Sequence, residues 1–129
     1  MSEPLSITLF GNIVTNSIKT RFPNLKIKVF EKHNLSNQNF VSKIQQLYIN
    51  ANFVNRWNPS EIDYILGVVD IKTNTPVSIL VLRKYNYTPG IAKQFLHIEY
   101  GMTSPQYEGM GLSTLLRKIC LAFAFDRGL

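Results

Sequence analysis

The stretch QFLHIEYGMT-SPQYEGMG-LSTLLRKICLAFAFD, residues 94–126, contains the local patterns that decide the fold. Residues 94–103 are rich in large apolar and aromatic side chains, which predicts a β-strand. Residues 104–111 contain proline and glycine and predict a turn. Apolar residues then recur at helical spacing and predict a helix over 112–126. A strand is therefore joined to a helix by a glycine-containing turn.

The patterns before this stretch predict one helix and three further strands. LKIKVF (25–30) alternates and predicts a strand, and the helical spacing that follows predicts a helix over about 37–51. DYILGVVDIK (63–72) and PVSILVLRK (76–84) predict a β-hairpin. Residues 1–24 are ambiguous, and we treat them as an N-terminal extension. The order predicts an α+β fold with a mainly antiparallel, mixed sheet flanked by helices.

Two polar segments carry more local signals. Ser36 or Asn37 is suited to cap the N-terminus of the predicted helix, because short polar side chains accept bonds from its first amides. Asn74 is suited to the tight bend between the two hairpin strands.

Composition and length exclude several classes of protein. The chain has 129 residues, 45% of them hydrophobic and 17% charged, which predicts one globular domain and not a disordered chain. A single cysteine, Cys120, excludes an internal disulfide framework and a multi-cysteine zinc site, and no cluster of metal ligands stands out, so we predict no metal. The N-terminus lacks the features of a signal peptide, and no apolar run approaches the roughly 20 residues of a membrane span. We therefore expect a soluble, intracellular and cytoplasmic protein with no membrane partner.

The charge is basic and unevenly distributed. The net charge is +6, with eleven basic and five acidic residues in 1–93 and three of each in 94–129. A basic body favours an anionic partner, which could be nucleic acid, a membrane surface or a polyanionic cofactor. The alternative is an ordinary protein with scattered lysines, because no basic cluster exceeds a few residues. A small basic nucleic-acid-binding domain is a third and weaker reading of the function.

The turn at 105–113 gives the strongest chemical signal. Gly109 and Gly111 let the backbone turn sharply and approach a ligand closely. The first amides of the following helix lack intrahelical acceptors, and the helix dipole favours an anion there, so the turn could hold a pyrophosphate. The alternative is an ordinary connection between a strand and a helix. The turn matches neither a P-loop nor a Rossmann fingerprint.

Residues 102–116, with the strand before them and the helix after, resemble motif A of the GCN5-related N-acetyltransferases (GNAT). The signature Q/R-x-x-G-x-G/A is matched literally from Gln106 through Gly109 to Gly111. A register shifted by two residues places Glu108 at the Arg/Gln position, Gly111 at the first glycine and Ser113 at the Gly/Ala position. The element order also matches, so the resemblance covers about residues 25–129, which we interpret as a partial GNAT-like domain.

This resemblance implies an acetyl-CoA-dependent acetyltransferase acting on a primary amine of a small molecule or protein. The amides of Tyr107, Gly109, Gly111 and Leu112 would hold the pyrophosphate, and strand residues 100–103 would bind the pantetheine arm. The implied cofactor-binding residues are Tyr100, Gly101, Met102, Thr103, Tyr107, Glu108, Gly109, Met110, Gly111, Leu112 and Ser113.

The implied reaction needs a base that deprotonates the amine. His97 and Glu99 lie two residues apart on the predicted strand and so share a face. Members of the family often carry a carboxylate or histidine on this strand. Glu99 is therefore the first choice for the base and His97 the second. The alternatives are a solvated or ion-paired Glu99 and a half-buried His97 satisfied by a neighbour.

Other chemically notable residues are interpreted mainly as structural. Trp57 and Arg56 lie where the family lines its acceptor groove, but core packing is the preferred interpretation. Tyr85 and Tyr87 are placed on a loop, and Cys120 is interpreted as a core thiol.

The sequence ends at Leu129, directly after the motif A helix, whereas the family fold continues. We therefore expect a truncated domain in which strand 94–103 is a sheet edge that self-associates or pairs with a partner. An alternative function is a non-catalytic acetyltransferase-like module that binds CoA or a protein partner.

Overall fold

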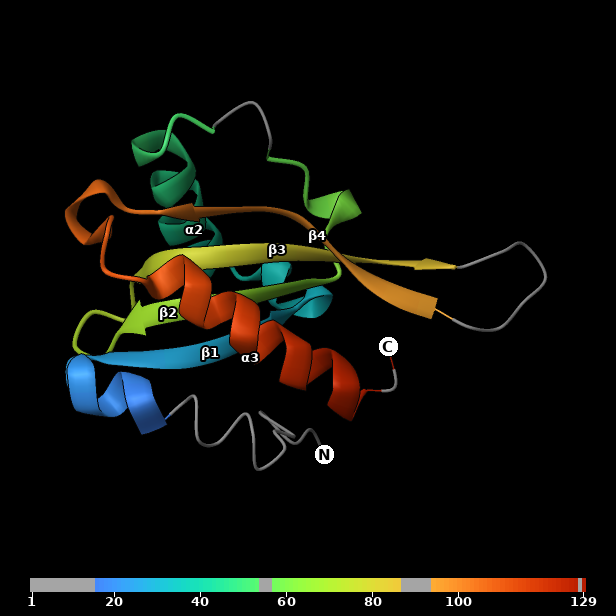
Figure 1. Ribbon diagram of the computed structural model, residues 1–129. Helices are drawn as coiled ribbons and strands as arrows, with labels where there is room; N and C mark the ends of the chain where they lie inside the picture. The colour runs from blue at the N-terminus through green and yellow to red at the C-terminus, as the bar shows by residue number, and fades with distance from the viewer. Residues whose placement is uncertain (1–15, 54–56, 87–93, 128) are drawn as a thin grey trace.

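The computed structural model describes residues 16–53, 57–86, 94–127 and 129. In this part of the chain, four strands form one antiparallel sheet in the order β1-β2-β3-β4, which is also their order along the chain (Figure 1). The strands are β1 (Leu25–Glu31), β2 (Tyr64–Asp70), β3 (Pro76–Asn86) and β4 (Gln94–Thr103). The predicted α+β class, the hairpin and all four strands are confirmed, with ends that differ by no more than two residues.

One long helix covers each face of the sheet (Figure 1). Helix α2 (Gln38–Asn50) follows β1, and helix α3 (Leu112–Asp126) follows β4. Asn37 caps α2 by accepting a bond from the Phe40 amide at 3.2 Å, and Asn74 has the positive φ of 58° that the hairpin bend needs. Both local predictions are confirmed.

The sheet separates two hydrophobic cores, which we name after the helices that cover them. The α3 core contains Leu66, Leu80 and Leu82 beneath Leu116 and Phe123. The α2 core contains Ile65, Ile79 and Val81 beneath Ile44, Leu47 and Tyr48. The alternation of strand residues between two faces explains why neighbours such as Leu80 and Val81 enter different cores.

Residues 16–21 form a short helical segment before β1. Ile18 of this segment is 1% exposed and belongs to the α3 core, and Phe22 packs against the same core. Residues 16–22, the part of the ambiguous stretch 1–24 that lies next to β1, are therefore anchored beside α3.

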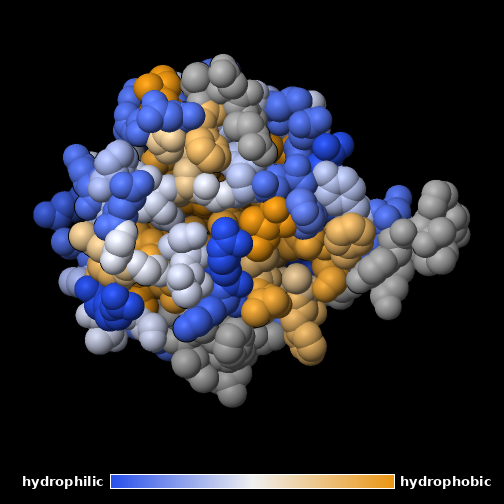
Figure 2. Space-filling view, turned by 45° about the horizontal axis from the view of Figure 1, so that its top comes forward, coloured by the Kyte–Doolittle hydropathy of each residue, from blue (hydrophilic) through white to orange (hydrophobic). Residues whose placement is uncertain are grey.

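The β4 strand lies at the edge of the sheet formed by the described residues, as expected. Figure 2 shows hydrophobic side chains exposed over the C-terminal half of α3 and the adjoining part of β4, where Leu121 and Phe125 are 70% and 77% exposed. Among the described residues, no helix combines the length and apolar character that crossing a membrane would require.

Candidate functional site

The glycine turn between β4 and α3 has a backbone conformation that its two glycines make accessible. A short 3₁₀ turn, Pro105–Tyr107, follows β4, and α3 begins at Leu112 with Gly111 as its N-cap. Gly109 and Gly111 have φ angles of +78° and +83°, in a region that residues with a Cβ rarely adopt. A Cβ built on either glycine would meet no protein atom within 4 Å. The turn is therefore open on the side where a ligand could approach.

The amides at the start of α3 indicate which kind of ligand could bind at the open turn. The Leu115 amide donates to the Gly111 carbonyl at 3.0 Å, so the amides of Leu112, Ser113 and Thr114 precede the first bond of the helix. Together with the helix dipole, such amides attract an anion. The Tyr107 amide, which the resemblance assigns to the pyrophosphate, instead donates to the Ser104 carbonyl at 2.8 Å. The 3₁₀ turn occupies this donor, and that assignment needs correction.

A cavity of about 520 Å³ extends from the glycine turn along the end of β4, a volume typical of sites for small molecules. Nine predicted cofactor-binding residues line it: Gly101, Met102, Thr103, Tyr107, Glu108, Gly109, Gly111, Leu112 and Ser113. Tyr100 and Met110 are not among its lining residues. Ala51 and Phe53, beyond the end of α2, and Thr114 also line it and were not predicted. No local pattern links Ala51 and Phe53 to the turn, whereas Thr114 could have been inferred as the third residue of the helix.

The first residues of the two motif registers, Glu108 and Gln106, line different hollows, whereas Gly109 and Gly111 both line the cavity. Glu108, Gly111 and Ser113 of the shifted register all line it. Gln106, the first residue of the literal register, lines a separate hollow beside α2 together with Gln46. In the shifted register, the glycine turn presents the carboxylate of Glu108 at the position where the motif has Arg or Gln.

A β-bulge in β4 separates the cavity from the predicted catalytic residues. Val81 pairs with Tyr100 and Leu82 pairs with Ile98, so Glu99 is an extra residue with no partner on β3. The bulge also changes the face of the strand, because Ile98 packs against the α3 core and Tyr100 against the α2 core. Tyr100 is fixed there by a 2.6 Å bond between its hydroxyl and that of Tyr48.

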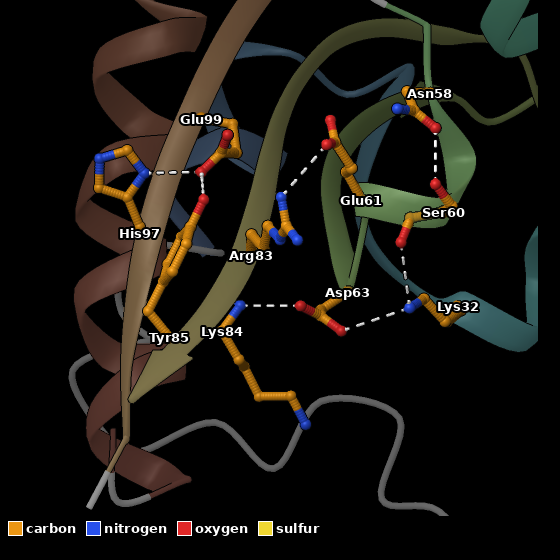
Figure 3. Close-up of polar contacts among 10 residues, drawn as sticks. All are labelled: Lys32, Asn58, Ser60, Glu61, Asp63, Arg83, Lys84, Tyr85, His97 and Glu99. Atoms are coloured by element: carbon orange, nitrogen blue, oxygen red, sulfur yellow. Dashed lines mark hydrogen bonds and ion pairs between the residues drawn. The ribbon is translucent and has the colours of Figure 1, made fainter. Parts of the chain in front are cut away.

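Glu99 is the centre of a polar cluster at this bulge (Figure 3). His97 Nδ1 lies 2.8 Å from Glu99 Oε2, and the Tyr85 hydroxyl donates to the same oxygen at 2.9 Å. The Tyr85 ring stacks on Phe95 and meets His97 edge to face, with centroid distances of 5.7 Å in both cases. The prediction that His97 and Glu99 share a face is confirmed. Tyr85 was placed on a loop, which is wrong, because β3 continues to Asn86 and pairs Tyr85 with Phe95.

The electrostatics of the cluster favour an ionised carboxylate. Partial burial favours the neutral form of Glu99, but the hydrogen bonds from His97 and Tyr85 outweigh it and hold the pKa of Glu99 below its ordinary value. The same hydrogen bond to Glu99 raises the pKa of Tyr85, which keeps its hydroxyl protonated. Because an ionised carboxylate only accepts hydrogen bonds, His97 Nδ1 carries the proton of that contact. In a neutral His97 ring, Nε2 is then the nitrogen that can accept a proton.

The remaining predicted residues have structural surroundings. Trp57 packs edge to face on Tyr48, with centroids 5.1 Å apart, in agreement with core packing. Cys120 is buried in the α3 core, and its burial raises the pKa of its thiol, which makes it a poor nucleophile. Arg56 and Tyr87 lie outside the described residues.

The fold is that of the GNAT acetyltransferases. A GNAT family acetyltransferase from Staphylococcus aureus superposes with a TM-score of 0.58 at 10% identity, over 81% of each chain. An aminoglycoside acetyltransferase from an uncultured soil metagenomic sample, solved in complex with sisomicin, also gives 0.58, at 14% identity over 83% of this chain and 74% of its own. No family model matches the sequence, and no curated protein sequence is detectably similar to it.

Proposed function

We propose that the protein is an N-acetyltransferase that transfers the acetyl group of acetyl-CoA to a primary amine. The observation that carries this proposal is the continuity of β4, which joins the open glycine turn, the cavity and the Glu99 cluster along about ten residues. A phosphate cradle beyond the end of β4 and a hydrogen-bonded histidine–carboxylate pair at the bulge of the same strand suit a cofactor whose phosphates and reactive thioester lie far apart. The GNAT fold supports the same reading.

The residues of the cavity fit acetyl-CoA by their chemistry. The open turn and the amides of Leu112, Ser113 and Thr114 would hold the pyrophosphate. The backbone of Gly101, Met102 and Thr103 would run beside the pantetheine arm, since these edge-strand residues line the cavity. Acetyl-CoA itself supplies the activated acetyl group as a thioester.

The Glu99 cluster would supply the base. The amine nitrogen attacks the thioester carbonyl, the carbon–sulfur bond breaks, and CoA leaves as the thiolate while the amine proton passes to a base. We assign this proton to His97 Nε2, because the His97 side chain is 55% exposed and that of Glu99 only 22%. Glu99 would hold the Nδ1 proton and stabilise the charged ring, and Tyr85 would hold Glu99. This reverses the order in which the sequence ranked the two residues.

The proposed acceptor is a primary amine. The structural neighbour solved with sisomicin makes aminoglycosides one class to test, beside polyamines and peptides. Isothermal titration with acetyl-CoA and CoA, followed by a thiol-release assay over this panel, tests the proposal. Binding of acetyl-CoA with amine-dependent thiol release supports it. Binding without release would support the alternative of a non-catalytic CoA-binding module.

We also propose that β4 pairs with a strand of a second chain, because β4 is the last strand of the sheet that the described residues form. Sedimentation velocity over a range of concentrations should show self-association. A monomer at all concentrations would contradict pairing between copies of this chain.

A further inference from the structure

Arg21 reaches the glycine turn from a segment far away in the sequence. Its Nη2 donates to the Met110 carbonyl at 3.3 Å, across 89 positions of the chain. Met110 lies between the two glycines of positive φ. The contact therefore places a permanent positive charge beside the backbone that forms the proposed phosphate cradle.

The short helical segment 16–21 holds Arg21 in this position. Ile18 is buried in the α3 core, and Phe22 packs on the same core and donates its amide to the Ile18 carbonyl at 2.7 Å. The Leu25 amide donates to the Phe22 carbonyl at 3.0 Å, which joins the segment to β1. The guanidinium also lies over the Phe22 ring, 5.1 Å from its centroid. Arg21 thus extends from an anchored backbone toward the turn.

The charge balance of the cavity explains what Arg21 could contribute. Of the residues that line the cavity, Glu108 is the one with a charged side chain, and it is negative. A carboxylate beside a pyrophosphate raises the free energy of binding, so the cradle needs a cation from outside its own lining. A guanidinium has five N–H groups, and the contact with Met110 involves one terminal nitrogen. The other donors can bind phosphate oxygens in a fork.

We propose that Arg21 is a phosphate-binding residue of this site and offsets the charge of Glu108 when the pyrophosphate of CoA binds. This inference rests on the proposed function, because it takes CoA to be the ligand of the cavity. It goes beyond the cofactor-binding residues that the resemblance implies, all of which lie within residues 100–113. It also assigns a binding role to the N-terminal segment.

The test is isothermal titration of the full chain and two variants with CoA, dephospho-CoA, pantetheine and inorganic pyrophosphate. Arg21→Gln removes the guanidinium, and Lys19→Gln removes an equal charge from an exposed position on the same segment. Arg21→Gln should weaken binding of CoA and dephospho-CoA at least tenfold, about 1.4 kcal/mol. Lys19→Gln should change binding less than twofold, and pantetheine should bind the wild type and Arg21→Gln equally.

Each result that differs from this expectation overturns the role of Arg21, the proposed function, or both. Equal CoA affinity in the two variants would overturn the role of Arg21 while leaving the proposed function intact. A loss confined to CoA, with dephospho-CoA unaffected, would move Arg21 from the pyrophosphate to the 3′-phosphate and overturn its placement at the turn. The wild type could instead bind pyrophosphate but not CoA, with pyrophosphate binding lost in Arg21→Gln. That result would retain an anion site at Arg21 and overturn the proposed function. Binding of neither ligand would overturn both.

Discussion

The two ends of the candidate site are built in different ways. At the glycine turn, the backbone forms the cradle, and the two glycines of positive φ with the first amides of α3 define its chemistry. At the bulge, three side chains from two strands form the cluster, and its geometry depends on a register shift between β3 and β4. The first end is encoded by neighbouring residues and the second by pairing between strands. Substitutions should therefore separate binding from catalysis.

The largest expected effect is the loss of the base. His97→Gln and Glu99→Gln should each lower the acetylation rate about a hundredfold or more, the usual contribution of a general base. Because neither side chain lines the cavity, the affinity for acetyl-CoA should change less than twofold. Thiol release and isothermal titration measure the two quantities separately. A Glu99→Gln rate within twofold of wild type from pH 6 to 9 would remove Glu99 from the mechanism and leave His97 acting alone.

The next effect should appear at the other end of the site. Gly111→Val should weaken acetyl-CoA binding at least tenfold, about 1.4 kcal/mol. A Cβ there meets no protein atom within 4 Å, so the side chain would occupy space that the ligand needs. Strain also follows, because a β-branched residue at a φ of +83° costs on the order of 1–3 kcal/mol of stability.

Asn74→Val is the matched control for this strain, since Asn74 has a φ of +58° in the β2–β3 bend and does not line the cavity. The melting temperature of Asn74→Val should fall as that of Gly111→Val does, but the affinity of Asn74→Val for acetyl-CoA should not change. Equal affinities in wild type and a folded Gly111→Val variant would show that the ligand does not contact the turn.

The sequence was most informative where neighbouring residues determine the structure. Asn37, Asn74 and the glycines of the turn act through their own backbone or that of residues a few positions away, so their roles could be predicted. The bulge at Glu99 could not be predicted, because it depends on how β4 pairs with β3. Tyr85 was missed as a strand residue since polar neighbours end the apolar pattern near Lys84.

The role of the N-terminal segment was also hidden from the sequence. Arg21 reaches Met110 because Ile18 packs in the α3 core, a contact between segments that are far apart in the sequence. Hydrophobic periodicity over six residues is too short to predict such a helix. The cavity residues Ala51 and Phe53 were missed for a related reason, since tertiary packing alone brings the end of α2 to the glycine turn.

A stability effect is expected where β4 lines the cavity. A Cβ on Gly101 would lie 2.6 Å from Leu80 Cδ2 and 3.2 Å from the Ile79 carbonyl oxygen. Leu80 is fully buried and cannot move aside freely, so Gly101→Ala should cost about 1–3 kcal/mol of unfolding free energy. Urea denaturation measures this, and adding Leu80→Val should recover part of the loss. An unchanged midpoint for Gly101→Ala would show that the strands separate more easily than this packing implies.

The smallest expected effect would show how the side-chain cluster is tuned. Tyr85→Phe removes one of the two hydrogen bonds that hold the pKa of Glu99 below its ordinary value, so this pKa should rise toward that value. Glu99 then becomes neutral at a higher pH as the solution is acidified, so the loss of kcat/KM that protonation of Glu99 causes within the acidic limb should move to higher pH. The rate near pH 8 should stay within twofold of wild type, because Glu99 is ionised there in both proteins. Tyr64→Phe, which removes a hydroxyl on the α3 side of the sheet, should leave the limb in place. A profile of Tyr85→Phe that is lowered equally at every pH would instead assign Tyr85 to packing against Phe95.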